Sequence, residues 1–92
     1  DPKLTETMLP TLERLAPGRV MELPKITGAE DFSYFANQVP GVFLIVGVTP
    51  QDQLASAAIN HSPRFFVDEG ALPNGAKALA RMTADWLFAN AK

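Results

Sequence analysis

An α/β fold is predicted for this sequence, and three features of its 92 residues favour it. Apolar residues recur with helical spacing near both ends of the chain. Between these ends, residues 42–48 are continuously apolar and rich in β-branched side chains, as in a strand covered on both faces. The predicted order is helix, strand, helix, strand, loop and helix, and this alternation is typical of an α/β domain.

The first helix is expected to begin at Asp1-Pro2, because aspartate caps helices well and proline suits the first helical turn. Its apolar face repeats at intervals of four, four and three residues: Leu4, Met8, Leu12 and Leu15. Pro10 is expected to bend or split this helix, because proline removes one internal hydrogen bond. Pro17-Gly18 is expected to end it.

Three elements are predicted in the middle of the chain. Val20–Leu23 is expected to form a short strand, and Ala29–Ala36 a short helix. Glu30 and Asp31 suit the start of that helix, where the helix dipole is positive. After a Pro-Gly turn, Val42–Val48 is expected to be the central strand of the sheet.

The last part of the chain is predicted to hold a loop and a terminal helix. Thr49–Phe66 has weak periodicity, and a long irregular segment in a compact domain is often functional. From Pro73 onwards a helix is expected to pack on the sheet. Its packing face is predicted to hold Leu72, Ala76, Leu79, Thr83, Trp86 and Leu87, with Lys77, Arg81 and Asp85 opposite.

Composition excludes several classes of function. The net charge is −2 and both signs are interspersed, so no positive field attracts nucleic acid or an anionic membrane. The longest apolar run, residues 42–48, is far shorter than the ~20 residues of a membrane-spanning helix, so we expect a soluble protein. The sequence has no cysteine, which rules out disulfides and suits a reducing compartment, so we expect a cytoplasmic location.

Two segments contain candidate functional residues. His61 is the one histidine and lies in Asn60-His61-Ser62-Pro63; from spacing alone it is either a surface side chain or a metal ligand. Gly28–Phe32 joins a glycine, two acids and a helix start, and it either faces an anion or is a capped helix with solvated acids. For Asp68-Glu69 we expect only a helix cap. No complete active site is present.

Three blocks of residues, taken together and in order, resemble a known family. They are Gly28–Phe35, Val39–Phe43 and His61–Glu69, and the similarity covers nearly all of the chain. The family is that of the metallopeptidase-like amidohydrolases, which includes hippurate hydrolases, indoleacetyl-amino acid hydrolases and N-acyl amino acid amidohydrolases. Ala29 departs from the pattern, because many relatives have serine there.

The resemblance implies that residues 1–92 are the C-terminal part of a catalytic domain, preceded by the rest of that domain and by a lid domain through which relatives commonly form homodimers. It implies that His61 binds one of two divalent metal ions, zinc or manganese, and that the general-base glutamate lies upstream. It also implies that five residues lie near the substrate: Gly28, Ala29, Glu30, Asp31 and Phe32. The intact parent would hydrolyse the amide bond of N-acyl or N-aroyl amino acids, and the isolated segment would be inactive.

The competing hypothesis is a non-catalytic binding or assembly module. In that case the sheet edges and aromatic side chains contact another chain, and His61 is incidental. The sequence upstream of Asp1 would distinguish the two hypotheses, because the enzyme requires further metal ligands there.

Overall fold

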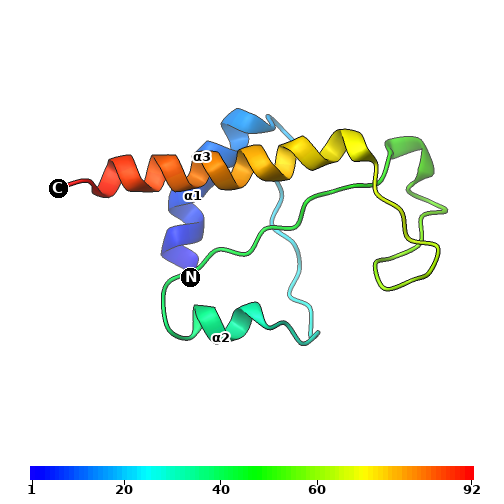
Figure 1. The fold of residues 1–92 in the computed structure, drawn as a ribbon, viewed down its shortest axis with the longest axis horizontal. Helices are drawn as coiled ribbons and strands as arrows, with labels where there is room; N and C mark the ends of the chain where they lie inside the picture. Colours follow the sequence, from blue (N-terminus) through cyan, green and yellow to red (C-terminus); the bar gives the residue numbers. More distant parts are fainter.

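The computed structural model describes residues 1–92, and all of its regular secondary structure is helical. In chain order the elements are α1 (Pro2–Leu15), α2 (Phe32–Ala36), the 3₁₀ helices η1 (Gln51–Gln53) and η2 (Glu69–Ala71), and α3 (Leu72–Asn90). Helices α1 and α3 cross and pack together, while the segments between them extend to one side (Figure 1). The molecule measures 48 by 28 by 19 Å and is therefore elongated.

Helix α1 begins and ends as the sequence predicts. The Asp1 side chain accepts a 2.7 Å hydrogen bond from the Leu4 N–H, which makes it the N-cap. After the helix ends at Leu15, Gly18 adopts a left-handed φ of +68°, a conformation in which glycine is unstrained. The helix is continuous through Pro10, so it is not split. Pro10 is exposed, and the one missing hydrogen bond is tolerated in a helix that packs against α3.

Helix α3 forms as predicted, but a different face of it packs against the rest of the chain. The predicted packing face remains largely exposed, including Leu72, Leu79, Trp86 and Leu87. The buried and half-buried positions are instead Gly75, Ala78, Met82, Ala84 and Asp85. The small side chains permit close approach, and a Cβ atom at Gly75 would lie 3.4 Å from Val46 Cγ2. The packing of α3 on a sheet is therefore wrong, and α1 is the helix that it contacts.

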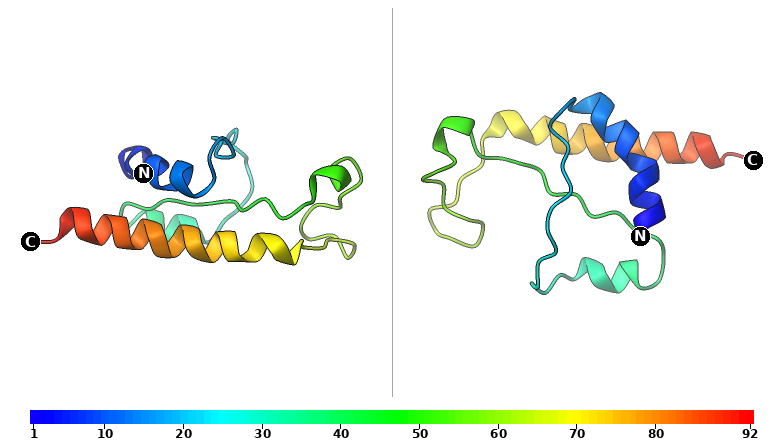
Figure 2. Two further views of the ribbon diagram at one scale, coloured as in Figure 1. Left: turned by 90° about the horizontal axis from the view of Figure 1, so that it is seen from above. Right: turned by 180° about the vertical axis from the view of Figure 1, so that it is seen from behind.

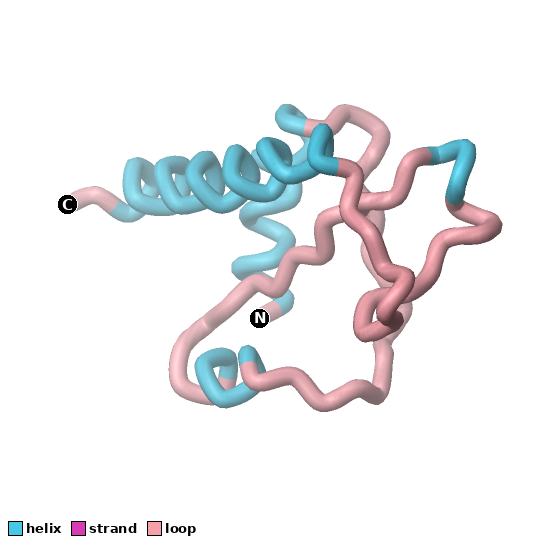
Figure 3. Tube along the Cα trace, turned by 45° about the vertical axis from the view of Figure 1, so that its right-hand side comes forward, coloured by secondary structure: helices cyan, strands magenta, loops and turns pink.

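The predicted α/β class, with its helix, strand, helix, strand, loop, helix order, is also wrong, because the structure contains no β-strand (Figure 3). Val20–Leu23 and Val42–Val48 have no regular secondary structure, and residues 42–48 run alongside α3 (Figure 2). A strand requires hydrogen bonds to a neighbouring strand, and neither segment has such a partner. The apolar pattern predicted strands, but it carried no information about pairing.

The remaining segments follow the predictions more closely. The second helix was expected over Ala29–Ala36 and is confined to Phe32–Ala36, because the residues before it form a turn closed by Ser33 N–H donating to Glu30 C=O at 3.1 Å. Thr49–Phe66 is irregular except for η1, as expected.

Few residues of the chain are buried within it. Only Met8, Thr11 and Met82 are buried, while many large apolar side chains, such as Ile45 and Phe88, are exposed. None of the helices combines the length and the apolar character that a membrane crossing requires. The 92 residues therefore have a small core at the crossing of α1 and α3 and wide apolar surfaces around it.

Candidate functional site

His61 lies in a turn with an uncommon backbone conformation. The Ser62 N–H donates a 3.1 Å hydrogen bond to the Ile59 C=O, which closes a four-residue turn. His61 has a φ of +73° and is the one non-glycine residue of the chain with positive φ. A turn with positive φ at its third residue alone has the character of type II, and glycine is usually found there. Histidine is thus held where glycine would be unstrained.

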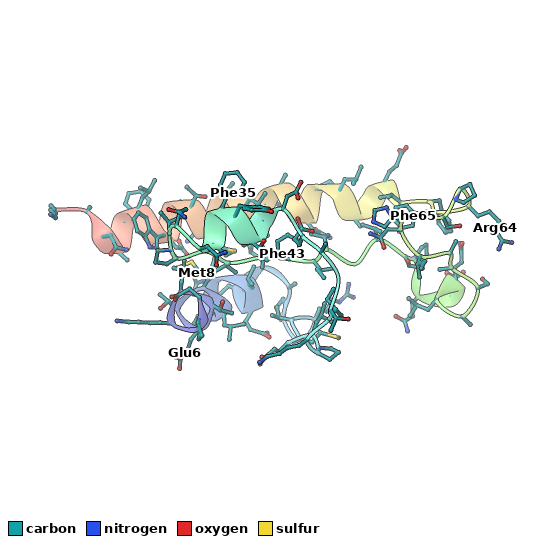
Figure 4. All side chains as sticks on the ribbon, turned by 90° about the horizontal axis from the view of Figure 1, so that it is seen from below. Glu6, Met8, Phe35, Phe43, Arg64 and Phe65 are labelled. Atoms are coloured by element: carbon teal, nitrogen blue, oxygen red, sulfur yellow. The ribbon has the colours of Figure 1, made fainter.

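A second turn follows directly. The Phe65 N–H donates a 3.0 Å hydrogen bond to the Ser62 C=O, and the Arg64 N–H donates one of 3.2 Å to Ser62 Oγ. Pro63 occupies the second position of this turn, where its fixed φ is favourable. Arg64 extends outward at this end of the molecule (Figure 4). Two consecutive turns therefore hold the backbone on both sides of His61 within the loop Thr49–Phe66.

The base of the loop is tied to α3. The Asp68 N–H donates a 2.8 Å hydrogen bond to the Val48 C=O, joining the two ends of the loop. The Asp68 side chain accepts a 3.0 Å hydrogen bond from the Gly70 N–H and caps η2, which leads into α3. The interpretation of Asp68 as a helix cap is confirmed. His61 thus projects from a loop whose base is held by the longest helix.

The donor set of the chain supplies one metal ligand but not a metal site. His61 is exposed, so its imidazole is accessible to a ligand, and imidazole nitrogen suits both zinc and manganese. No group of three or more His, Cys, Asp or Glu side chains gathers anywhere in the chain. A bound metal needs at least three to four ligands. His61 therefore fits a metal as one ligand among several that other residues would have to provide.

Gly28–Phe32, the second predicted segment, lies apart from the His61 loop. No hydrogen bond or ion pair joins the two. Glu30 accepts a 3.3 Å hydrogen bond from the Phe32 N–H, whereas Asp31 is the N-cap residue of α2 without a side-chain hydrogen bond to the helix. Gly28 and Ala29 are exposed and lie outside any regular secondary structure. Glu30 is thus the one acid of the segment bonded to the start of α2, and the role of the segment near a substrate stays a prediction.

Phe32 is the residue of this segment with a defined packing role. Its ring lies 5.2 Å from that of Phe43, with an angle of 37° between the planes. A Cβ atom at Gly41 would lie 2.9 Å from the Phe32 ring, so any larger residue there would require the ring to shift. Phe32 and its neighbours border an open apolar hollow of about 370 Å³ between α1, α2 and α3; Met8, Phe35, Met82 and Trp86 also line it.

A polar cluster that sequence analysis did not predict joins α1 to α3. Asp85 accepts hydrogen bonds of 2.6 Å from Thr11 Oγ and from Arg14, and Arg81 pairs with its other oxygen at 3.0 Å. The hydrogen bond from Thr11 and the two nearby guanidinium groups hold the pKa of Asp85 below its usual range. Periodicity alone had placed Asp85 on the outer face of the helix. The cluster orients the two helices, and both oxygens of its single carboxylate are already paired with Thr11, Arg14 and Arg81.

Ser62 is the other residue that sequence reasoning missed. The signal that could have identified it is the Ser-Pro pair directly after Asn60-His61, because asparagine, serine and proline are all turn formers.

The chain matches a peptidase family and several hydrolases over most of its length. A family model described as peptidase family M20/M25/M40 matches residues 1–85. The IAA-amino acid hydrolase ILR1-like 6 of Arabidopsis thaliana is 34% identical over 77 residues, which are 84% of this chain and 16% of that protein. The ILR1-like 2 hydrolase of the same organism is 40% identical over 67 residues, which are 73% of this chain and 15% of that protein.

Thermostable carboxypeptidase 2 of Saccharolobus solfataricus is 35% identical over 80 residues, which are 87% of this chain and 20% of that protein. The chain thus spans one fifth or less of the length of each of these relatives. No solved structure matches the chain significantly.

Proposed function

The chain belongs to peptidase family M20/M25/M40, and from this premise we propose that it is the C-terminal part of the catalytic domain of a metal-dependent amidohydrolase. The observation that carries the proposal is His61, an exposed imidazole presented by two consecutive turns at the end of a loop based on α3. In this proposal His61 is one ligand of a two-metal centre. The other ligands and the general base come from residues outside this chain.

The proposed substrate class rests on the names of two relatives. Two of the relatives carry names that describe hydrolysis of IAA-amino acids, which are N-acyl amino acids. We extend that class to this protein and propose an N-acyl or N-aroyl amino acid as the substrate, cleaved at its amide bond. The proposal includes a homodimer formed through a lid domain.

The contribution of this chain to the chemistry is ligation and orientation. Two divalent ions, when bound, supply an activated water and stabilise the charge that develops on the amide oxygen. His61 would hold one ion through a ring nitrogen, and a neutral imidazole is the form that binds metal. The turns fix the backbone from which the ring projects, and the Asp68–Val48 hydrogen bond closes the base of the loop.

The exposed apolar surface suits this proposal. Side chains such as Ile45 and Leu79 are more than half exposed, and burying apolar area is favourable by ~25 cal/mol per Å². In the enzyme, the rest of the catalytic domain would cover these faces. In the alternative, a binding or assembly module, a separate protein would cover them.

The full-length protein tests the proposal directly. Turnover of hippurate-like substrates is measured before and after chelation, and then again after addition of Zn²⁺ or Mn²⁺. A mock-treated sample carried through the same dialysis is the control. We expect activity to disappear on chelation and to return with one of the two metals. Full activity without bound metal would refute the mechanism, and a folded full-length protein with no turnover of any N-acyl amino acid would favour the binding module.

A further inference from the structure

One hydroxyl beside His61 has no role in the proposed function so far. Ser62 takes part in both turns: its N–H closes the turn that contains His61, and its C=O closes the next one with Phe65. Its Oγ also accepts the 3.2 Å hydrogen bond from the Arg64 N–H. Ser62 is half-buried, whereas His61 and Arg64 are exposed. Three separate polar groups of one residue therefore hold the segment after His61.

The backbone of His61 depends on these hydrogen bonds. A left-handed conformation is unfavourable for a residue with a Cβ atom, so His61 would move to negative φ if the turn were free to open. The Ser62 N–H prevents this while it remains bonded to Ile59. Pro63 restricts Ser62 to extended conformations, and the hydroxyl holds Arg64 in place. The direction of the His61 Cα–Cβ bond is fixed by the residue that follows it.

We infer that Ser62 is a positioning residue for His61: its hydroxyl accepts the Arg64 N–H, stabilises the second turn, and so helps to fix the left-handed backbone from which the imidazole reaches a metal. The inference rests on the proposed function of His61 as a metal ligand. A side chain that orients a ligand without touching the metal typically changes affinity by ~10- to 100-fold. Loss of the hydroxyl should therefore act on metal binding and much less on folding.

The test uses the metal-depleted full-length protein, titrated with Zn²⁺ and in a separate series with Mn²⁺. Ser62→Ala removes the hydroxyl and keeps both backbone hydrogen bonds, and Ser62→Thr restores a hydroxyl. Ser56→Ala is the matched control, because Ser56 lies in the same loop and its hydroxyl donates to the Gln53 C=O at 3.3 Å. We expect Ser62→Ala to weaken metal binding by ~10-fold, Ser62→Thr to recover most of it, and Ser56→Ala to equal the wild type.

Thermal unfolding of the metal-free variants separates positioning from a general structural role. The expected result is a metal affinity that falls in Ser62→Ala while the midpoint of unfolding stays close to that of wild type and Ser56→Ala. The inference is overturned if Ser62→Ala keeps the metal affinity of wild type, or if Ser56→Ala loses as much affinity as Ser62→Ala. It is also overturned if Ser62→Ala loses affinity only in proportion to a lowered midpoint of thermal unfolding. His61→Asn provides the remaining comparison, since asparagine tolerates positive φ. If His61→Asn loses metal and Ser62→Ala does not, only the positioning inference is overturned; if His61→Asn keeps its metal, the proposed function itself is wrong.

Discussion

Replacing His61 by glycine should raise or preserve the stability of the protein while abolishing its metal-dependent activity. The φ of +73° at His61 is the reason for the first expectation, because glycine adopts this conformation without strain. The hydrogen bonds of the two turns join backbone groups of other residues and Ser62 Oγ, so the exchange removes none of them. Only the side chain is lost.

The magnitude follows from two opposing terms. A left-handed backbone costs a residue with a Cβ atom ~1–2 kcal/mol, which glycine would recover. Glycine also loses more conformational freedom on folding, at a cost of ~0.5–1 kcal/mol. The net change for His61→Gly is therefore between zero and ~1.5 kcal/mol in favour of the variant. His61→Ala retains the strain and gains nothing.

The functional change has the opposite sign. If His61 is a metal ligand, its removal should lower both metal occupancy and turnover by ~10-fold or more, since even the loss of a group that only orients a ligand reaches that scale. His61→Ala should lose function to the same degree as His61→Gly. The two variants then differ in stability and agree in activity.

The assay combines unfolding of the metal-free full-length protein in urea, metal content of the loaded protein and turnover of a hippurate-like substrate. Asn60→Gly is the control, because Asn60 precedes His61 in the same turn and does not have positive φ. It should lose ~0.5–1 kcal/mol of stability and keep its metals. Loss of more than ~1 kcal/mol in His61→Gly would refute the strain argument. Normal occupancy and turnover would identify His61 as a surface side chain of a turn.

Three further predictions concern the rest of the chain. The isolated 92 residues should be inactive and should self-associate or unfold with a broad transition, because large apolar side chains such as Ile45 and Phe88 are exposed. A monodisperse monomer in light scattering, with a sharp and concentration-independent unfolding transition, would contradict this. The stability that Asp85 contributes should be fully present above the ordinary aspartate pKa of about 3.9 and be lost as pH falls through the lowered pKa of the folded state. The difference in unfolding free energy between wild type and Asp85→Asn should therefore shrink only in strong acid. A difference that is the same at every pH would contradict this prediction. Gly41→Ala should displace the Phe32 ring and cost about 1 kcal/mol in thermal unfolding, and an unchanged midpoint would show that the ring moves freely.

The sequence predicted the features that depend on neighbouring residues. The cap at Asp1, the end of α1 near Gly18 and the cap at Asp68 were each confirmed. Each requires only a side chain or a glycine acting on backbone within a few positions, so the residue types carry the information. The irregular character of Thr49–Phe66 was predicted for the same reason.

Family membership was likewise determined by the sequence alone. The ordered blocks that end in His61–Glu69 identified the family, and the match of the family model over residues 1–85 agrees with them. The role of His61 was inferred from the same blocks and remains a prediction. Its left-handed backbone had no signal in the sequence, because histidine occurs at negative φ in most contexts.

The tertiary structure decided which surfaces meet. Periodicity indicated that α3 has an apolar face, but the face that packs holds Gly75, Ala78 and Met82. Gly75 approaches Val46 there, and Asp85 bonds to Thr11 of α1. The apolar run at residues 42–48 predicted a central strand, yet a strand exists only when another segment donates and accepts its hydrogen bonds. Helix caps and turns depend on residues within a few positions of one another, so the sequence predicts them. The pairing of strands and the choice of the helix face that packs depend on residues distant in the chain, so only the folded molecule determines them.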